Sequence, residues 1–460
     1  MFKILEKNKC FLLLVILTFL SAAFLYRHAF SSYFFQDDWF TFRISRAENL
    51  TEFFNFFIPR KDVIYFRPFG MQIPFFLMNQ IWGINAAPYR LLTFSTHIFN
   101  TFLIYLLLKL LIKDRFFSWL GAFMYATSVV SLIPFYWFAT YSFILCVTFF
   151  FLSSLFFLQF IGKRKYHFLL FSFIFYFVGL LTNELVAALP IIWSLYLILI
   201  KKSKIIFSLL SHYLLTLFII ILRFVWFSPP THGLYKMELG WNIIQNLKTY
   251  FFWIFNWSEI LTEQMVTPFV FNFRIMDYYP QFAYLSIVGI SLLISTIFIS
   301  AISYFFSKHR ENNQHILIFG IIWYFIALLP VILFSQHKFP YYLPIALSGF
   351  LLSFINLLSN LRGRLIENRK YFFHSFILIL LIAWVGTSLV TEEYFYSDHW
   401  APRRALIAKK IIDNAQIKGN GLFVLNTDEN RLALNGQDAA KVIFGNETIT
   451  KYSTASGVIK

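Results

Sequence analysis

Eleven long apolar segments run through this chain, and they limit its fold more than any other feature. Each is close to the roughly 20 residues that an α-helix needs to cross the hydrocarbon core of a bilayer. Of the 460 residues, 59% are hydrophobic and only 13% are charged, which is unusual for a soluble domain. The sequence therefore predicts an all-α polytopic membrane protein with about eleven transmembrane helices. The predicted spans cover residues 11–30, 91–112, 117–134, 137–161, 166–182, 185–200, 205–227, 282–306, 316–334, 340–360 and 371–390.

Basic residues cluster in short loops on one side of these spans. In a soluble protein the net charge of +17 would suggest a nucleic-acid partner. Here the Lys and Arg side chains mark cytoplasmic loops, so we expect the lipid bilayer and no nucleic acid as a partner. Most of the 22 acidic residues then face outward. The clusters are Lys3/Lys7/Lys9, Lys109/Lys113/Arg115, Lys163/Arg164/Lys165, Lys201/Lys202/Lys204, Lys308/Arg310 and Arg362/Arg364/Arg369/Lys370.

Two long loops and the carboxy-terminal tail are predicted to lie outside the cytoplasm. The loop at 31–90 carries apolar residues at helical spacing, which predicts short interfacial helices. The tail predicts a helix followed by a strand at 421–425, hence a small α/β domain. We therefore divide the chain into a transmembrane domain at 1–390 and an extracytoplasmic domain at 391–460. A composition rich in Phe, Ile, Tyr, Asn and Lys is typical of AT-rich bacterial genomes, which favours a bacterial plasma membrane.

An acidic pair, Asp37 and Asp38, follows directly after the first predicted span. Carboxylates beside the hydrocarbon are costly unless they are solvated, paired or used in chemistry. A carboxylate next to apolar surface can have a raised pKa and can take a proton from a hydroxyl, which makes a general base one interpretation. The two acids could also share a divalent cation. The plain alternative is solvated loop acids, with Asp38 as the N-cap of the next helix.

Four further candidates lie at outward ends of spans. Glu184 follows Asn183 in a turn between two spans, where an acid at membrane depth is a functional candidate and a capped turn is the alternative. Arg67, His337 and Lys338 precede later spans. Cationic side chains there suit a lipid phosphate, while simple snorkelling to the headgroups is the alternative.

The order of these motifs resembles the GT-C superfamily of polytopic glycosyltransferases, which use polyprenyl-phosphate-linked sugars. The likeness covers about 30–200 well, the last turn more loosely, and the tail not at all. It rests on Gln36-Asp37-Asp38-Trp39, on Tyr65-x-Arg67-Pro68, on Asn85-x-x-Pro88-Tyr89-Arg90 with His97-x-x-Asn100, on Asn183-Glu184 with Leu189-Pro190, and on Tyr342-Leu343-Pro344.

The resemblance implies an enzyme with an inverting mechanism on the outer face of the membrane. Asp37 would be the catalytic base and Asp38 its partner. Arg67 and Lys338, with His337 beside them, would bind the lipid phosphate, and Glu184 would orient the sugar or hold a cation. The donor would be a polyprenyl-phosphate sugar, and the acceptor a glycan, lipid or protein hydroxyl. No cofactor is assigned, although a divalent cation is one candidate.

Two other functions fit a polytopic chain with outward acids. A transporter or flippase of a lipid-linked saccharide would need inverted repeats and charged or broken helices near the midplane. The sequence carries no convincing internal repeat. An assembly protein that recruits partners through its tail is the third alternative.

Overall fold

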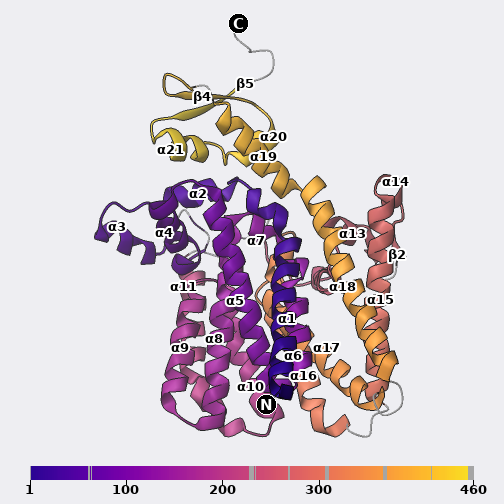
Figure 1. Cartoon of the computed structure of the whole chain (residues 1–460). Coiled ribbons are helices and arrows are strands. Elements are labelled where there is room, and N and C mark those ends of the chain that lie inside the picture. Colours follow the sequence, from indigo (N-terminus) through magenta and orange to yellow (C-terminus); the bar gives the residue numbers. More distant parts are fainter. Residues whose placement is uncertain are drawn as a thin grey trace.

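The computed structural model describes residues 2–60, 63, 65–226, 233, 235–267, 270–305, 310–365, 370–415 and 417–453. A body of near-parallel helices carries a small tail unit at the end opposite the amino terminus (Figure 1). The long helices of the body are α1 (Phe2–Leu25), α5 (Ala86–Ile112), α6 (Arg115–Ala126), α8 (Ser142–Lys163), α9 (Tyr166–Leu180), α10 (Leu189–Leu199), α11 (Leu210–Trp226), α15 (Pro280–Phe305), α16 (Arg310–Leu328), α17 (Pro344–Leu365) and α18 (Lys370–Asp398).

Shorter elements connect these helices, mostly at the end that carries the tail. They are η1 (Arg27–Ser31), α2 (Asp37–Ile44), α3 (Leu50–Phe54), η2 (Asn55–Phe57), η3 (Pro68–Gln72), α4 (Ile73–Trp82), η4 (Val129–Ser131), α7 (Leu132–Tyr136), η5 (Phe138–Thr140), η6 (Glu184–Ala188), η7 (Ser203–Leu209), α12 (Asn242–Trp253), α13 (Glu259–Glu263), β1 (Met265–Thr267), β2 (Val270–Phe271), α14 (Ile275–Tyr278) and η8 (Pro340–Tyr342). Strands β1 and β2 form an antiparallel pair.

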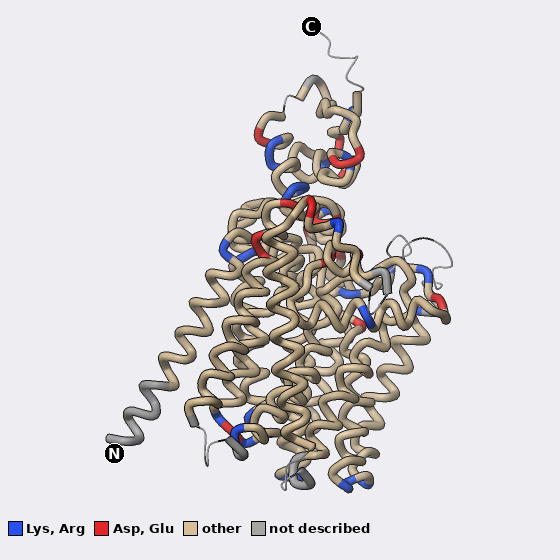
Figure 2. The backbone as a smooth tube through the Cα atoms, turned by 90° about the vertical axis from the view of Figure 1, so that its right-hand side faces the viewer, with Lys and Arg blue, Asp and Glu red and all other residues tan. Residues whose placement is uncertain are grey.

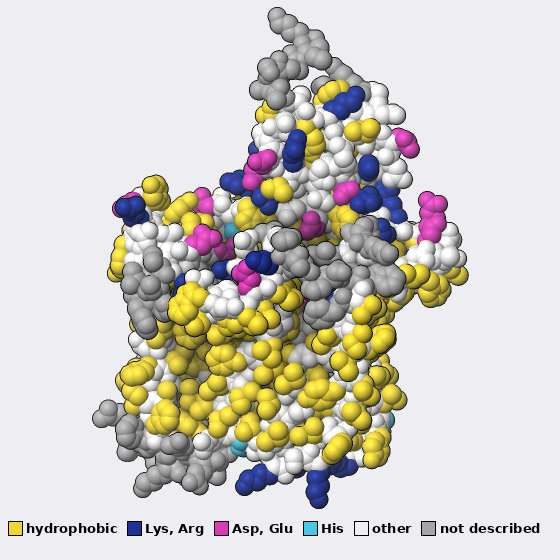
Figure 3. All heavy atoms as spheres, turned by 180° about the vertical axis from the view of Figure 1, so that it is seen from behind, with side chains coloured by type: hydrophobic (Ala, Val, Ile, Leu, Met, Phe, Trp, Pro, Cys, Tyr) yellow, Lys and Arg dark blue, Asp and Glu magenta, His cyan; other side chains and the backbone are white. Residues whose placement is uncertain are grey.

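The polytopic helical class predicted from the sequence agrees with this structure. Within the described ranges, seven helical stretches are long and apolar enough to cross a membrane, and four more apolar helices are shorter. Each predicted span coincides with one of these stretches. The number of helices that cross a bilayer stays a prediction. The space-filling view shows an apolar belt between two ends that carry the charges (Figure 3).

The third and fourth predicted spans are interrupted where they meet. Between α6 and α8 the chain forms the short turns η4, α7 and η5, all buried. Pro134 lies in the first turn of α7, where a proline is tolerated, but its ring prevents a helix from continuing back through it. This break places backbone amides of η5 inside the protein, next to α2.

Helices α16 and α17 pack closely against each other. A Cβ atom at Gly349 would come within 2.8 Å of the carbonyl oxygen of Gly320, so only glycine fits at this crossing. Small residues at helix crossings let backbones approach in a bilayer, where dispersion contacts replace the hydrophobic effect between helices. Ile326 of α16 and the segment that follows this helix line the cavity described below.

Acidic and basic residues are distributed differently between the two ends of the helical body. Figure 2 shows the acidic residues gathered mainly toward the tail, and Lys and Arg at both ends. The cytoplasmic position of the opposite end remains a prediction. The side chains of Lys3, Lys7, Lys9, Lys308, Arg310, Arg364, Arg369 and Lys370, which belong to the predicted cationic clusters, lie outside the described part of the structure.

The tail folds into a small α/β unit. Strand β4 has the bounds expected from the sequence, and it pairs antiparallel with β3 and parallel with β5, from Gly421 opposite Ile449 to Leu425 opposite Ser453. The division of the chain after residue 390 stays a prediction, because α18 crosses that residue without a break. The tail elements are α19 (Trp400–Asp413), β3 (Ile417–Lys418), β4 (Gly421–Leu425), α20 (Asp428–Ala433), α21 (Asp438–Phe444) and β5 (Ile449–Ser453).

Candidate functional site

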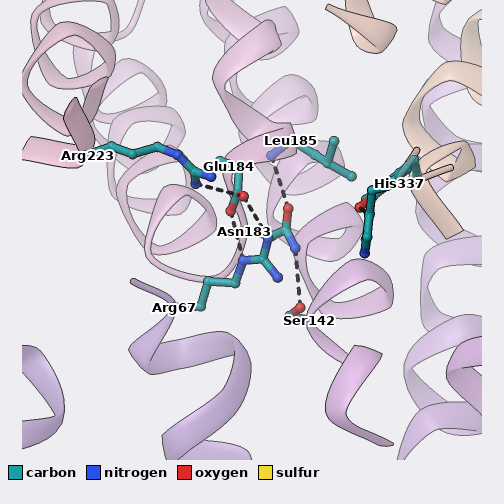
Figure 4. Close-up of polar contacts among 8 residues, drawn as sticks. Arg67, Ser142, Asn183, Glu184, Leu185, Arg223 and His337 are labelled. Atoms are coloured by element: carbon teal, nitrogen blue, oxygen red, sulfur yellow. Dashed lines mark hydrogen bonds and ion pairs between the residues drawn. The ribbon is translucent and has the colours of Figure 1, made fainter. Parts of the chain in front are cut away.

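Glu184 lies at the centre of a three-residue charge cluster (Figure 4). Its two carboxylate oxygens accept hydrogen bonds from Arg67 Nε at 2.8 Å and Arg67 Nη2 at 2.7 Å. Arg223 Nη1, from α11, reaches Glu184 Oε1 at 3.1 Å. A bidentate Arg–carboxylate pair of this kind holds both side chains in one orientation. The cluster therefore carries two positive charges and one negative charge.

The turn before Glu184 is a capped helix start, as the plain alternative predicts. Asn183 Oδ1 accepts the amide hydrogen of Leu185 at 3.1 Å, and the Asn183 side-chain amide donates to Ser142 Oγ at 3.2 Å. Asn183 thus caps η6 and leaves the next side chain, Glu184, to face the cavity. The capping interpretation and the functional one apply to neighbouring residues of the same turn.

Gly70 explains how Arg67 reaches this turn. The amide of Phe69 donates to the carbonyl of Leu181 at 3.2 Å, so η3 runs against the end of α9. A Cβ atom at Gly70 would collide with the Thr182 carbonyl and would come within 2.7 Å of the Ser142 Cβ. Only glycine allows this approach, and the approach sets Arg67 opposite Glu184.

Asp37 lies in the first turn of α2, where the helix dipole favours a carboxylate. Its side chain lines the cavity and is half-buried. Within the described residues, the Asp37 carboxylate receives no hydrogen bond and no ion pair. Burial, with a smaller contribution from the nearby Asp438, raises the pKa of Asp37 to about 6. A carboxylate without a partner and with a raised pKa suits proton abstraction near neutral pH.

Asp38 has a different environment from its neighbour. Its Oδ1 accepts the amide hydrogen of Ala139 at 2.6 Å, and its Oδ2 accepts that of Phe35 at 3.2 Å. Burial raises the pKa of Asp38 to about 7, while the nearby Arg90 opposes this shift. Asp38 is not the N-cap of α2, because Gln36 occupies that position. With both oxygens bound to amides, Asp38 is poorly placed to share a cation with Asp37.

The neighbours His337 and Lys338 differ in position. His337 lines the cavity, stacks on Tyr235 with ring centroids 4.1 Å apart, and shares a hydrogen bond of 2.5 Å with the Tyr342 hydroxyl. Burial and the nearby Arg67 lower the pKa of His337 to about 4, so its ring is neutral at physiological pH. Lys338 is not among the residues that line the cavity. The structure therefore does not bring Lys338 to the other candidates.

One cavity of about 920 Å³ joins Asp37, Arg67, Glu184 and His337. The half-buried tyrosines Tyr65 and Tyr235 lie within electrostatic reach of both Asp37 and Arg67. Burial raises the pKa of both tyrosines, and the charge of Asp37 adds to the rise. The candidate base and the candidate anion site thus share one cavity, in line with the predicted position of these residues at the same ends of the apolar segments.

The tail closes one side of this cavity. Trp400 and Arg404 of α19 and Leu432 of α20 line it. Arg404 Nη1 donates to Gln36 Oε1 at 2.9 Å, directly beside Asp37. Further contacts join α2 to the tail: Trp39 Nε1 donates to the carbonyl of Ala433 at 3.1 Å, and Arg43 Nε to Asp438 Oδ1 at 2.8 Å. The tail is therefore part of the site.

Several site residues have little or no signal in the sequence. Arg223 stands out as a charge near the outer end of an apolar span, but its partner Glu184 lies 39 positions away. Trp400 and Arg404 belong to a tail without a recognisable motif, and only its docking on α2 places them in the cavity.

Comparison with known proteins gives few matches. No protein-family model and no curated protein sequence matches the chain. Among solved structures, the chain is similar to the archaeal oligosaccharyltransferase AglB from Archaeoglobus fulgidus, determined in complex with an inhibitory peptide and a dolichol-phosphate. The sequence identity is 14%, the TM-score is 0.49, and the match covers 96% of this chain. The chain spans 64% of the length of AglB, which is less than two thirds.

Proposed function

We propose that this chain is an inverting glycosyltransferase of GT-C type that moves a sugar from a polyprenyl-phosphate donor to an acceptor hydroxyl. The observation that carries this proposal is the single cavity in which the unpaired Asp37 carboxylate faces the same space as the Arg67–Glu184–Arg223 cluster. Glycosyl transfer from a lipid phosphate needs these two groups: a base for the acceptor and cations for the leaving phosphate.

Asp37 is the base in this mechanism. The acceptor oxygen forms a bond to the anomeric carbon while the bond from that carbon to the phosphate oxygen breaks. The acceptor proton passes to Asp37, and the electron pair of the broken bond stays on the polyprenyl phosphate. Positive charge develops on the sugar ring in the transition state, as in other glycosyl transfers. Asp38 holds the η5 backbone against α2 and so positions Asp37.

Arg67 and Arg223 bind the phosphate. Glu184 neutralises only one of the two guanidinium charges, so the cluster keeps one net positive charge. A guanidinium has five N–H donors, and the contacts with Glu184 leave donors of Arg223 for a phosphate oxygen. Glu184 is then the residue that orients both arginines, and Arg223 replaces Lys338 as the second phosphate ligand.

The inner walls of the cavity suit the lipid chain of the donor. They are formed by apolar residues of α10, α11 and the end of α16, among them Ile191, Ile220 and Ile326. Ile191 and Ile220 are 37% and 42% exposed, although both are apolar. A polyprenyl chain can therefore stay among apolar side chains, since exposure to water costs about 0.8 kcal/mol per CH₂ group.

Aromatic side chains line the part of the cavity near Asp37. Trp137 and Trp400 pack edge to face with ring centroids 5.6 Å apart, and Phe339 lies 6.5 Å from Trp400. Flat aromatic faces combine apolar area with a fixed orientation, which suits the C–H face of a sugar ring. The acceptor is a glycan, lipid or protein hydroxyl on the outer side of a bacterial plasma membrane, where the reaction would contribute to the cell envelope.

Mass spectrometry of the reaction products tests the proposal. Purified protein in liposomes is incubated with a panel of synthetic polyprenyl-phosphate pentoses and hexoses and with a membrane extract as acceptor. We expect free polyprenyl phosphate and an acceptor heavier by one sugar for at least one donor. Asp277→Asn, which removes an exposed acid of α14, serves as the active control. Transport of the donor across the liposome bilayer without any new glycosidic bond would favour a flippase and contradict the proposal.

A further inference from the structure

A second polar cluster lies outside the cavity, where the first and last long helices end. It contains His28 of η1 and the neighbours Glu392 and Glu393 of α18. One ligand atom from each residue lies within 4.8 Å of the others. The His28 ring is fixed by stacking on Tyr396, with ring centroids 3.9 Å apart. A side-chain nitrogen and two carboxylates thus meet between segments more than 360 positions apart in the sequence.

Two members of this cluster have buried polar atoms without hydrogen-bond partners among the described residues. Glu392 is fully buried, and neither of its carboxylate oxygens has a hydrogen bond. The Nε2 atom of His28 is also buried without one, and so is the hydroxyl of Tyr136, whose ring packs on Phe395 one turn further along α18. Buried polar groups are almost always satisfied, so each exception requires an explanation.

Arg27 compensates only partly for the missing hydrogen bonds of Glu392. Its guanidinium lies 3.5 Å from Glu392 and 3.6 Å from Glu393, beyond the usual length of a charge-assisted hydrogen bond. The same group donates at 2.8 Å to the carbonyl of Phe24 and lies over the Phe24 ring. Two carboxyl groups thus share one guanidinium. Because its side chain is 34% exposed, Arg27 can turn toward solvent.

We propose that His28, Glu392 and Glu393 form a binding site for a divalent transition-metal ion, with Zn²⁺ as the first candidate. One imidazole nitrogen and two carboxylates are typical zinc ligands, and a fourth position would take water. Ligand atoms about 2 Å from such an ion lie about 3–4 Å apart, so modest side-chain rotation closes the site. A metal ion would satisfy Nε2 of His28 and the oxygens of Glu392 together.

The position of the site predicts a structural role for the ion. Helix α18 continues to Asp398, and α19 then begins at Trp400, which lines the cavity (Figure 1). On the other side, Asp37 follows His28 by nine positions. An ion that joins η1 to α18 therefore holds together the two segments that deliver Asp37 and Trp400. Metal binding itself does not depend on the proposed transfer reaction.

Metal analysis of the full-length protein tests the site. The protein is purified in detergent with a tag that contains no histidine, treated with a chelator, and titrated with Zn²⁺. We expect about one equivalent of zinc per chain. His28→Ala and Glu392→Gln should each weaken binding by at least about ten-fold, the smallest loss typical even for groups that only support a metal ligand. Asp398→Asn, an acid on the same helix outside the cluster, should bind zinc normally.

Arg27→Gln separates a metal site from a simple ion pair. Removal of the competing cation should strengthen zinc binding, whereas an ion-pair role alone gives no zinc binding in any variant. The zinc titration of the wild-type protein tests the proposed metal site even if a variant does not fold. In wild-type protein loaded with Cu²⁺, electron paramagnetic resonance should show coupling to one imidazole nitrogen. Absence of stoichiometric zinc in the wild type, or equal affinity in His28→Ala and Glu392→Gln, would overturn the proposal.

Discussion

The Arg67 guanidinium donates two hydrogen bonds to the Glu184 carboxylate, at 2.8 and 2.7 Å, although 117 positions separate the two residues. The pair joins the segment before η3 to the turn before α10. Close contact of Gly70 with the Thr182 carbonyl makes this geometry possible. The shared carboxylate also holds Arg223, so a change at Glu184 affects both arginines.

Glu184→Gln should lower both stability and transfer. Loss of the carboxylate leaves two partly buried guanidinium groups without a counter-charge. Breaking a fully buried pair costs about 3–5 kcal/mol, and the cost here should be smaller because the Glu184 side chain is 31% exposed. Thermal unfolding in detergent measures this effect. Glu52→Gln, an exposed acid of α3, is the control, and equal melting temperatures of the two variants would show that the cluster is not structural.

The transfer rate should depend on pH through Asp37. Burial raises the pKa of Asp37 to about 6, so the basic form is present above that pH and is lost as the pH falls through it. We expect kcat/KM to fall about ten-fold per unit below pH 6 and to stay level above it. Asp438→Asn removes the second cause of the shift and should move the inflection to lower pH. A flat profile between pH 4.5 and pH 8, on the order of the range needed to titrate such a base, would contradict this role.

Arg404→Ala should impair transfer, although Arg404 makes no hydrogen bond or ion pair with the described residues Arg67, Glu184 and Arg223. Arg404 bonds to Gln36 at 2.9 Å and to Glu429 at 3.2 and 3.3 Å, and thereby ties the tail to the residue before Asp37. A small misplacement of a reacting group can cost about 100-fold, so we expect a loss of up to that size. Arg431→Ala, which removes a bond to Asn426 within the tail, is the control in the same assay. Equal activity of both variants would show that the tail docks without functional consequence.

The orientation of the chain is open to chemical labelling. With Cys10 and Cys146 replaced by serine, a single cysteine at Glu52 should react with an impermeant maleimide in intact cells. A cysteine at Lys202 should react only after lysis, because positive loops stay in the cytoplasm. Both positions are exposed in the structure. The reverse labelling pattern would place the cavity on the cytoplasmic side.

The helical body follows from the sequence because long apolar segments have few alternatives to a membrane helix. The helix interruption around Pro134 is not predicted from the apolar segments, because this interruption depends on how one short turn packs against α2. The predicted number of helices and the predicted side of the membrane for each loop follow from hydrophobicity and charge. Breaks in helices inside buried regions are instead decided by tertiary contacts.

The site is predictable only in part. Asp37, Arg67 and Glu184 are unusual charges at the ends of apolar segments that are predicted to face outward, and that pattern is visible in the sequence. Adjacent positions such as Asp37/Asp38 or His337/Lys338 differ in the structure, because one member of each pair lines the cavity and the other does not. Sequence patterns do not show which of two adjacent side chains points into the cavity. The contribution of Arg404 depends on tail docking and has no local signal.

The most direct test of the central claim is a single-turnover measurement on Asp37→Asn with donor already bound. Binding of the polyprenyl-phosphate sugar should be unchanged, because the arginine cluster is intact. Transfer should slow by about 10²–10⁴-fold, the usual contribution of a positioned general base. Folding should be preserved, since the amide replaces a half-buried carboxylate without a partner among the described residues. Transfer by Asp37→Asn at the rate of the Asp277→Asn control would contradict the proposed mechanism.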